Sequence, residues 1–160
     1  MKEIRIGIIG TQATISRGAF ENYIKELDNS CEVYARACPL FVPLAENGHI
    51  NDNITRLAAE KYLKDLRELN LSSLILGCTH YPMLKNIIGE IIQAELIDAG
   101  VEAAYKLKQV MLENNLLNSN NSGRLEIFIS DEGMNFSEIA SSFLGFDIKS
   151  GISKVNIEEY

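Results

Sequence analysis

Short apolar runs alternate with segments of helical periodicity along this chain. Ile4–Ile9 is a near-continuous apolar run that predicts a strand, and Leu74–Leu76 predicts a strand buried on both faces. The other segments that predict strands are Glu32–Ala37, Leu96–Ile97 and Leu125–Ile129. Helical spacing predicts a helix over Arg17–Leu27 with Ser16 as its N-cap, and a longer helix that is capped by Asn51 or Asp52. A third helix is predicted to begin at Pro82, and a fourth to run from Gly100 to about Leu112. A short fifth helix is predicted to be capped by Ser137 and to end at Gly145. The segments Cys38–Gly48 and Asn114–Gly123 predict loops. This alternation is typical of an α/β fold, in which helices flank a parallel β-sheet.

The run Leu74–Pro82, LILGCTHYP, is the most informative part of the pattern. Its strand stops at Gly77 and is followed by Cys78, Thr79 and His80, and Pro82 suits the first turn of a helix. Cys78 is therefore expected in a strand-to-helix turn at the carboxyl edge of a parallel sheet, where open α/β sheets bind their ligands. A thiol near a helix N-terminus and beside an imidazole can have its pKa lowered from about 8.5 toward neutrality. The residues leave two interpretations of Cys78 open: a reactive thiol, or a structural cysteine of the kind that is commonly buried.

Composition and charge exclude several classes of protein. The chain has 160 residues, of which 46% are hydrophobic, enough for a sizeable core. It lacks the apolar run that a membrane span requires, and its N-terminus enters a strand pattern rather than a signal-peptide core. A net charge of −7 disfavours binding to nucleic acid. Three cysteines without CxxC spacing and two histidines argue against a disulfide framework and a metal site. A cytoplasmic protein with reduced thiols is expected, with no membrane or nucleic-acid partner.

Four segments, in order, resemble the glutamate racemases of the aspartate/glutamate racemase family. They are GIIGTQAT (Gly7–Thr14), ACPLFVPLAENG (Ala37–Gly48), LILGCTHYP (Leu74–Pro82) and LIDAG (Leu96–Gly100), and IFISDEG (Ile127–Gly133) also looks like the C-terminus of that family. Aspartate racemases share a cysteine at this place but usually have Glu after Cys-Thr. His80 therefore favours glutamate. The resemblance implies a racemase-like parallel sheet with flanking helices, followed by a C-terminal α/β segment.

The family resemblance also implies a reaction and roles for particular residues. Such enzymes interconvert L- and D-glutamate for peptidoglycan precursors, without a cofactor, by using one cysteine on each face of the α-carbon. Cys78 matches the cysteine that works on L-glutamate. By the same resemblance, His80 assists Cys78 and Glu46 holds His80. The residues implied to contact glutamate are Thr79, His80, Thr11 and Thr14.

The residues by themselves are also compatible with purely structural roles for these side chains. Thr11 and Thr14 could serve only as turn and capping residues, and His80 could merely cap the following helix. Glu46 could be a solvated carboxylate in a loop. No lysine or arginine lies in the matched motifs, so a dicarboxylate substrate would have to be met by backbone N–H groups and hydroxyls.

The chain departs from the family at its start. It begins where the second domain of the family begins, so the segment that carries the other catalytic cysteine is expected to be absent, and neither Cys31 nor Cys38 lies in a matching turn. Residues 1–97 are expected to form the second domain, and residues 98–160 the segment that in the family completes the first. Three interpretations stay open: a truncated gene product, one half of a split enzyme, or a degenerate homologue that acts as a binding module. A homo-oligomer or a complementing N-terminal segment is the expected partner. A hydrolase that uses Cys78 as nucleophile is a more distant alternative, because no oxyanion-hole partner can be named.

Overall fold

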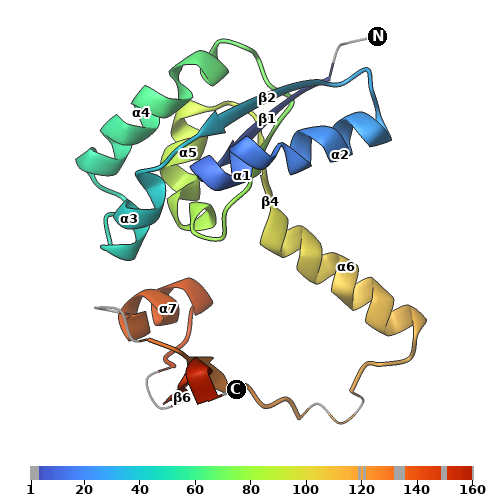
Figure 1. The fold of residues 1–160 in the computed structure, drawn as a ribbon, viewed down its shortest axis with the longest axis vertical. Coiled ribbons are helices and arrows are strands. Elements are labelled where there is room, and N and C mark those ends of the chain that lie inside the picture. Colours follow the sequence, from blue (N-terminus) through green and yellow to red (C-terminus); the bar gives the residue numbers. More distant parts are fainter. Residues whose placement is uncertain (1–3, 119, 121, 132–135, 149–150, 160) are drawn as a thin grey trace. The chain divides into compact units, whose positions relative to one another are not determined.

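The computed structural model describes residues 4–118, 120, 122–131, 136–148 and 151–159. The chain forms two compact units, residues 1–107 and 108–160. The elements of both are labelled in Figure 1. The first unit contains all the residues that the sequence singles out as candidate site residues.

A four-stranded parallel sheet is the centre of the first unit. Its strands are β1 (Arg5–Gly10), β2 (Glu32–Ala37), β3 (Ser73–Leu76) and β4 (Glu95–Asp98), in the order β2-β1-β3-β4. The pairing aligns their carboxyl ends to within one residue, because Gly10 lies opposite Ala37 and Leu76 lies opposite both Ile9 and Asp98. The predicted parallel sheet is confirmed, and its carboxyl ends form one edge.

Helices connect these strands across both faces of the sheet, and a last helix follows β4. They are α1 (Gln12–Arg17), α2 (Ala19–Leu27), α3 (Phe41–Glu46), α4 (Asn53–Arg67), the 3₁₀ helix η1 (Tyr81–Leu84), α5 (Lys85–Ile91) and α6 (Ala99–Glu113), which runs into the second unit. The buried Ile9 belongs to the core formed with α3, α4 and α5, whereas its neighbour Ile8 lines a small hollow together with Ile15 of α1 and Phe20 of α2. Successive strand residues point to opposite faces, so α1 and α2 cover one face and α4 and α5 the other (Figure 1).

The described residues of the second unit include the end of α6, a short parallel pair of strands and two further helices. Besides α6, its elements are β5 (Ile127–Ile129), α7 (Phe136–Leu144), β6 (Ile152–Lys154) and the 3₁₀ helix η2 (Ile157–Glu159). Ile127 pairs with Ile152 and Ile129 with Lys154, and Ile148 is buried. The prediction that residues 98–160 complete another domain stays a prediction.

Several local predictions are wrong. The segment Cys38–Gly48, expected as a loop, contains α3, which tolerates Pro43 because the first turn of a helix does not use that N–H group. The helix expected over Arg17–Leu27 is broken at Gly18, whose φ of 62° ends α1, so Ser16 lies inside α1 instead of capping α2. Ser137 lies within α7 rather than at its cap, and β6 was not expected.

Candidate functional site

Cys78 lies immediately beyond the end of β3. The N–H of Gly77 donates to the carbonyl of Ile9 at 2.8 Å, which keeps the chain against β1 up to that residue. The chain then turns, and the N–H of Tyr81 donates to the carbonyl of Cys78 at 3.1 Å, where η1 begins. Cys78 is half-buried. The predicted position of Cys78, in a strand-to-helix turn at the carboxyl edge of the sheet, is confirmed.

Gly77 makes this turn possible because it has no side chain. A Cβ atom at this position would lie 2.9 Å from the carbonyl oxygen of Ile9 and 3.2 Å from the ring of Phe20. A backbone oxygen in a central strand has little freedom to move. Glycine therefore lets the end of β3 approach β1 closely enough to place Cys78 at the edge.

His80 connects Cys78 to a carboxylate on another element. The Sγ atom of Cys78 lies 3.9 Å from Nδ1 of His80, and Nε2 of the same ring lies 3.2 Å from Oε1 of Glu46. Glu46 is the last residue of α3. A neutral imidazole that donates from Nε2 to Glu46 presents the lone pair of Nδ1 to the thiol, and an imidazolium in the same place stabilises a thiolate. The arrangement can accept a proton from Cys78 or return one.

The predicted threonines have different surroundings. Thr79 is exposed, and its Oγ1 lies 3.5 Å from Nδ1 of His80, within reach of the same nitrogen that faces Cys78. The hydroxyls of Thr11 and Thr14 lie 3.0 Å apart, and Thr11 also accepts from the N–H of Thr14 as the N-cap of α1. Thr11 directly follows β1, the strand next to β3, so it shares the carboxyl edge with Cys78. Only the bond from the N–H of Thr14 to Thr11 is a capping contact, and a role of the three threonines in binding substrate stays a prediction.

The other two cysteines, Cys31 and Cys38, are buried in the structure. Cys31 is 5% exposed and Cys38 is 0% exposed. Burial raises the pKa of the Cys38 thiol to about 12, and burial also raises the pKa of Cys31. Both thiols therefore stay protonated near neutral pH, which keeps them poor nucleophiles.

Tyr81 belongs to the site but was not singled out from the sequence. It is 0% exposed, and its hydroxyl donates to the backbone carbonyl of Cys38 at 2.9 Å. Its position directly after the Cys-Thr-His run is the sequence feature that could have indicated a place in the site, since a buried tyrosine hydroxyl needs a hydrogen-bond partner.

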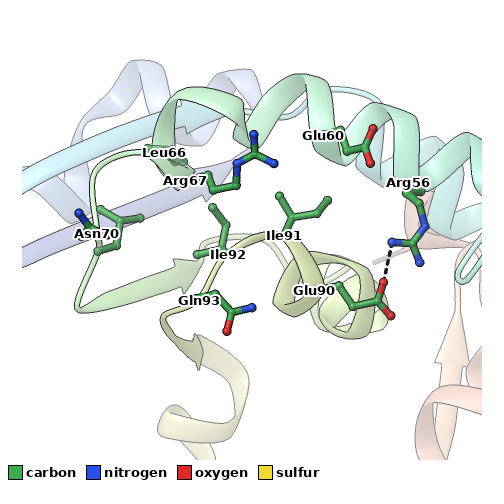
Figure 2. A pocket seen from close by; sticks show the side chains of 10 residues that line it. Arg56, Glu60, Leu66, Arg67, Asn70, Glu90, Ile91, Ile92 and Gln93 are labelled. Atoms are coloured by element: carbon green, nitrogen blue, oxygen red, sulfur yellow. Dashed lines mark ion pairs between the residues drawn. The ribbon is translucent and has the colours of Figure 1, made fainter.

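The structure also has a groove between α4 and α5, which other residues line. Figure 2 shows it: apolar side chains of Leu66, Ile91 and Ile92 lie inside, and Arg56 pairs with Glu90 at 2.5 Å on the rim. Its volume is about 450 Å³. The candidate site residues do not line this groove, so it gives no support to their proposed roles.

Among the residues that the structure describes, no group of three or more His, Cys, Asp or Glu side chains could hold a metal ion. Within the same residues, no helix is long and apolar enough to cross a membrane.

Comparison with known sequences gives a consistent set of relatives. A family model described as Asp/Glu/Hydantoin racemase matches residues 1–107. The glutamate racemase of Thermoanaerobacter sp. (strain X514) is 39% identical over 158 residues, which are 98% of this chain and 60% of that protein. The glutamate racemase of Geobacter metallireducens is 41% identical over 144 residues, 88% of this chain and 53% of that protein. The chain thus spans little more than half the length of these relatives.

The solved structures that resemble this chain are also glutamate racemases. A crystal structure of glutamate racemase from Francisella tularensis in complex with D-glutamate aligns with a TM-score of 0.90 at 33% identity, over 98% of this chain and 59% of that one. The Thermus thermophilus glutamate racemase in complex with beta-chloro-D-alanine aligns with a TM-score of 0.83 at 34% identity, over 99% of this chain and 59% of that one.

Proposed function

Because the chain belongs to the Asp/Glu/Hydantoin racemase family, we propose that it carries one half of the active site of a glutamate racemase, with Cys78 as the base for L-glutamate. The contact of the Cys78 thiol with His80, which in turn pairs with Glu46, carries this proposal. Relatives about 40% identical are named glutamate racemases, and the Francisella tularensis enzyme holds D-glutamate in its crystal structure. The isomerase would act in the cytoplasm and supply D-glutamate for peptidoglycan precursors.

The proposed reaction breaks the bond between the α-carbon and its hydrogen. The thiolate of Cys78 takes that proton and becomes a thiol, and the electron pair stays on the α-carbon. A thiol on the opposite face then gives its own proton to the carbon, which inverts the configuration and leaves a thiolate there. His80 holds or relays the proton of Cys78, and Glu46 orients the imidazole. Nothing is oxidised or reduced in this sequence, and it needs no cofactor.

The second acid would come from outside the described chain. Cys31 and Cys38 are buried and protonated, so neither is suited to act on the opposite face of the substrate. We infer a complementing segment, or another copy of the chain, that brings a second thiol to the carboxyl edge of the sheet. Exposed aromatic side chains in the second unit, Phe128, Phe143 and Phe146, offer apolar surface for such a partner.

The substrate would be held by uncharged groups. Thr11, Thr14 and Thr79 carry hydroxyls at the carboxyl edge or next to His80 and are proposed to bind the carboxylates of glutamate. Charge-assisted hydrogen bonds to a carboxylate are about twice as strong as neutral ones, which makes hydroxyls and N–H groups adequate ligands.

The test is a complementation assay. The protein is mixed with a separate polypeptide that carries the part of the Thermoanaerobacter glutamate racemase that this chain does not match, and D-glutamate formed from L-glutamate is measured by chiral chromatography. The proposal predicts D-glutamate from the mixture, and loss of at least about 100-fold of that activity in Cys78→Ala but not in Cys31→Ala. Activity that survives Cys78→Ala, or a mixture that binds together without racemising glutamate, would refute it and leave a binding module as the better description.

A further inference from the structure

We propose that Tyr81 is a positioning residue whose hydroxyl and ring hold the turn of Cys78 and His80 against the start of α3, and so keep His80 beside Glu46. The proposal rests on the proposed function only in taking His80 and Glu46 as the groups that serve Cys78. It concerns the geometry of those groups, which can be measured without substrate.

The hydroxyl of Tyr81 joins two segments far apart in the sequence. It donates to the carbonyl of Cys38 at 2.9 Å, and that carbonyl also accepts from the N–H of Phe41 at 3.1 Å. Cys38 precedes α3 and Phe41 is its first residue, whereas Tyr81 directly follows His80. One buried oxygen is thus bonded both to α3 and to the residue next to the imidazole.

The ring of Tyr81 makes a second link to the same helix. It packs edge-on against Phe41, with ring centroids 5.2 Å apart and an interplanar angle of 79°. Phe41 in turn packs edge-on against Tyr62 of α4, at 5.6 Å and 81°. Phe41 begins α3 and Glu46 ends it. Because one short rigid helix contains both residues, holding Phe41 in place also fixes the position of the Glu46 carboxylate, which pairs with His80 at 3.2 Å.

Apolar packing by itself would not call for a hydroxyl at this place. A phenylalanine would fill nearly the same volume, and a buried hydroxyl costs free energy unless it is hydrogen-bonded. Burial and the nearby thiols of Cys38 and Cys78 raise the pKa of Tyr81, so its hydroxyl stays a donor over the whole physiological range. The hydrogen bond of the hydroxyl therefore fixes the distance between Tyr81 and the start of α3, which ring packing alone would not fix.

The variant Tyr81→Phe tests this directly, and Tyr62→Phe is its matched control. Both remove one hydroxyl from the same aromatic cluster, and the carbonyl of Cys38 keeps the N–H of Phe41 in either case. Two signals are read: the rate at which iodoacetamide alkylates Cys78 at neutral pH, and the NMR signals of the imidazole carbons. His49 is the only other histidine in the sequence and pairs with Asp52, which makes it an internal reference.

The expected result is specific to Tyr81. In Tyr81→Phe the alkylation of Cys78 slows about five-fold, the size of one lost hydrogen bond, and the signals of His80 move while those of His49 do not. Tyr62→Phe changes neither. In a Glu46→Gln background Tyr81→Phe adds nothing further, because the pair that it positions is already broken.

Other outcomes would overturn the proposal. Equal effects of Tyr81→Phe with and without Glu46→Gln would make Tyr81 a purely structural residue, and so would an unchanged His80 signal. If Tyr81→Phe does not fold, Phe41→Leu, which loosens the ring contact and leaves the hydroxyl in place, must move the His80 signals, or the proposal fails. Neither readout involves racemisation, so a failure of the proposed function in the complementation assay is recognised separately.

Discussion

Nε2 of His80 and Oε1 of Glu46 lie 3.2 Å apart, although one residue belongs to the turn after β3 and the other ends α3. The two side chains are 33% and 58% exposed, so the pair lies at the surface and is screened by solvent. Its contribution to stability is accordingly small. We propose that the pair instead orients the imidazole toward Cys78.

Removing the charge of Glu46 should therefore affect Cys78 more than it affects stability. In Glu46→Gln the amide keeps the shape of the side chain but holds an imidazolium less well, and we expect Cys78 to react with iodoacetamide about three- to ten-fold more slowly at neutral pH. The midpoint of thermal unfolding should stay within a few degrees. Glu60→Gln, in the groove between α4 and α5, is the matched control and should leave the rate unchanged. An unchanged rate in Glu46→Gln would show that the pair does not serve the thiol.

The three cysteines should differ in reactivity. In the folded protein near pH 7.5 we expect iodoacetamide to modify Cys78 at least about ten-fold faster than Cys31 or Cys38, because the latter are buried with raised pKa values. Peptide mass spectrometry over time gives the three rates separately, and denatured protein supplies the reference in which they converge. Equal rates in the folded state, or faster modification of Cys31, would contradict a reactive Cys78.

The buried thiol of Cys38 should give stability a measurable pH dependence. Its pKa is about 12 in the folded state and about 8.5 in an unfolded chain, so the unfolded state loses this proton first as the pH rises. The contribution is complete below about pH 8.5 and falls toward pH 12, by at most about 1.4 kcal/mol per pH unit. Denaturant unfolding between pH 8 and about 10.5 should show a shallower decline for Cys38→Ala than for the wild type. Parallel declines would mean that Cys38 does not stay protonated in the folded state.

Among the glycines at the sheet edge, we expect replacement of Gly77 to cost the most stability. Its replacement by alanine would push a Cβ atom against the carbonyl of Ile9, and we expect Gly77→Ala to cost about 1–3 kcal/mol of stability and to slow the alkylation of Cys78. Gly89→Ala is the control, since the nearest atom to a Cβ there is a side-chain carbon of Leu96 at 3.5 Å. The control should be neutral or slightly stabilising in chemical denaturation. A Gly77→Ala protein as stable as the control would contradict the close packing of this turn.

The sheet and the position of Cys78 were predictable because they depend on local pattern. Buried parallel strands appear as apolar runs, and Gly77 with Pro82 marks the change from strand to helix. The helix α3 was missed because it has six residues and contains Pro43, so it has neither the length nor the periodicity of a typical helix. β6 was missed for the same reason, since its three residues form a strand only by pairing with β5.

The connections within the site depend on the tertiary fold. Glu46 was connected to His80 only through the family resemblance, because the sequence does not reveal that the end of α3 meets the turn after β3. The sequence does not reveal which group accepts the hydrogen bond of Tyr81, since the acceptor is the backbone carbonyl of Cys38. The roles of Thr11, Thr14 and Thr79 toward a substrate stay predictions.

The central claim is that Cys78 removes the α-proton of L-glutamate, and hydrogen exchange with the solvent tests it most directly. The protein is combined with the complementing polypeptide of the Thermoanaerobacter enzyme in which the cysteines are replaced by alanine, in D₂O, so that Cys78 is the only exposed thiol at the site. The α-proton signal of L-glutamate and of D-glutamate is then followed by NMR. The account predicts that deuterium enters L-glutamate without racemisation, that D-glutamate does not exchange, and that Cys78→Ala abolishes the exchange. Exchange that persists in Cys78→Ala, or exchange of D-glutamate instead of L-glutamate, would contradict it.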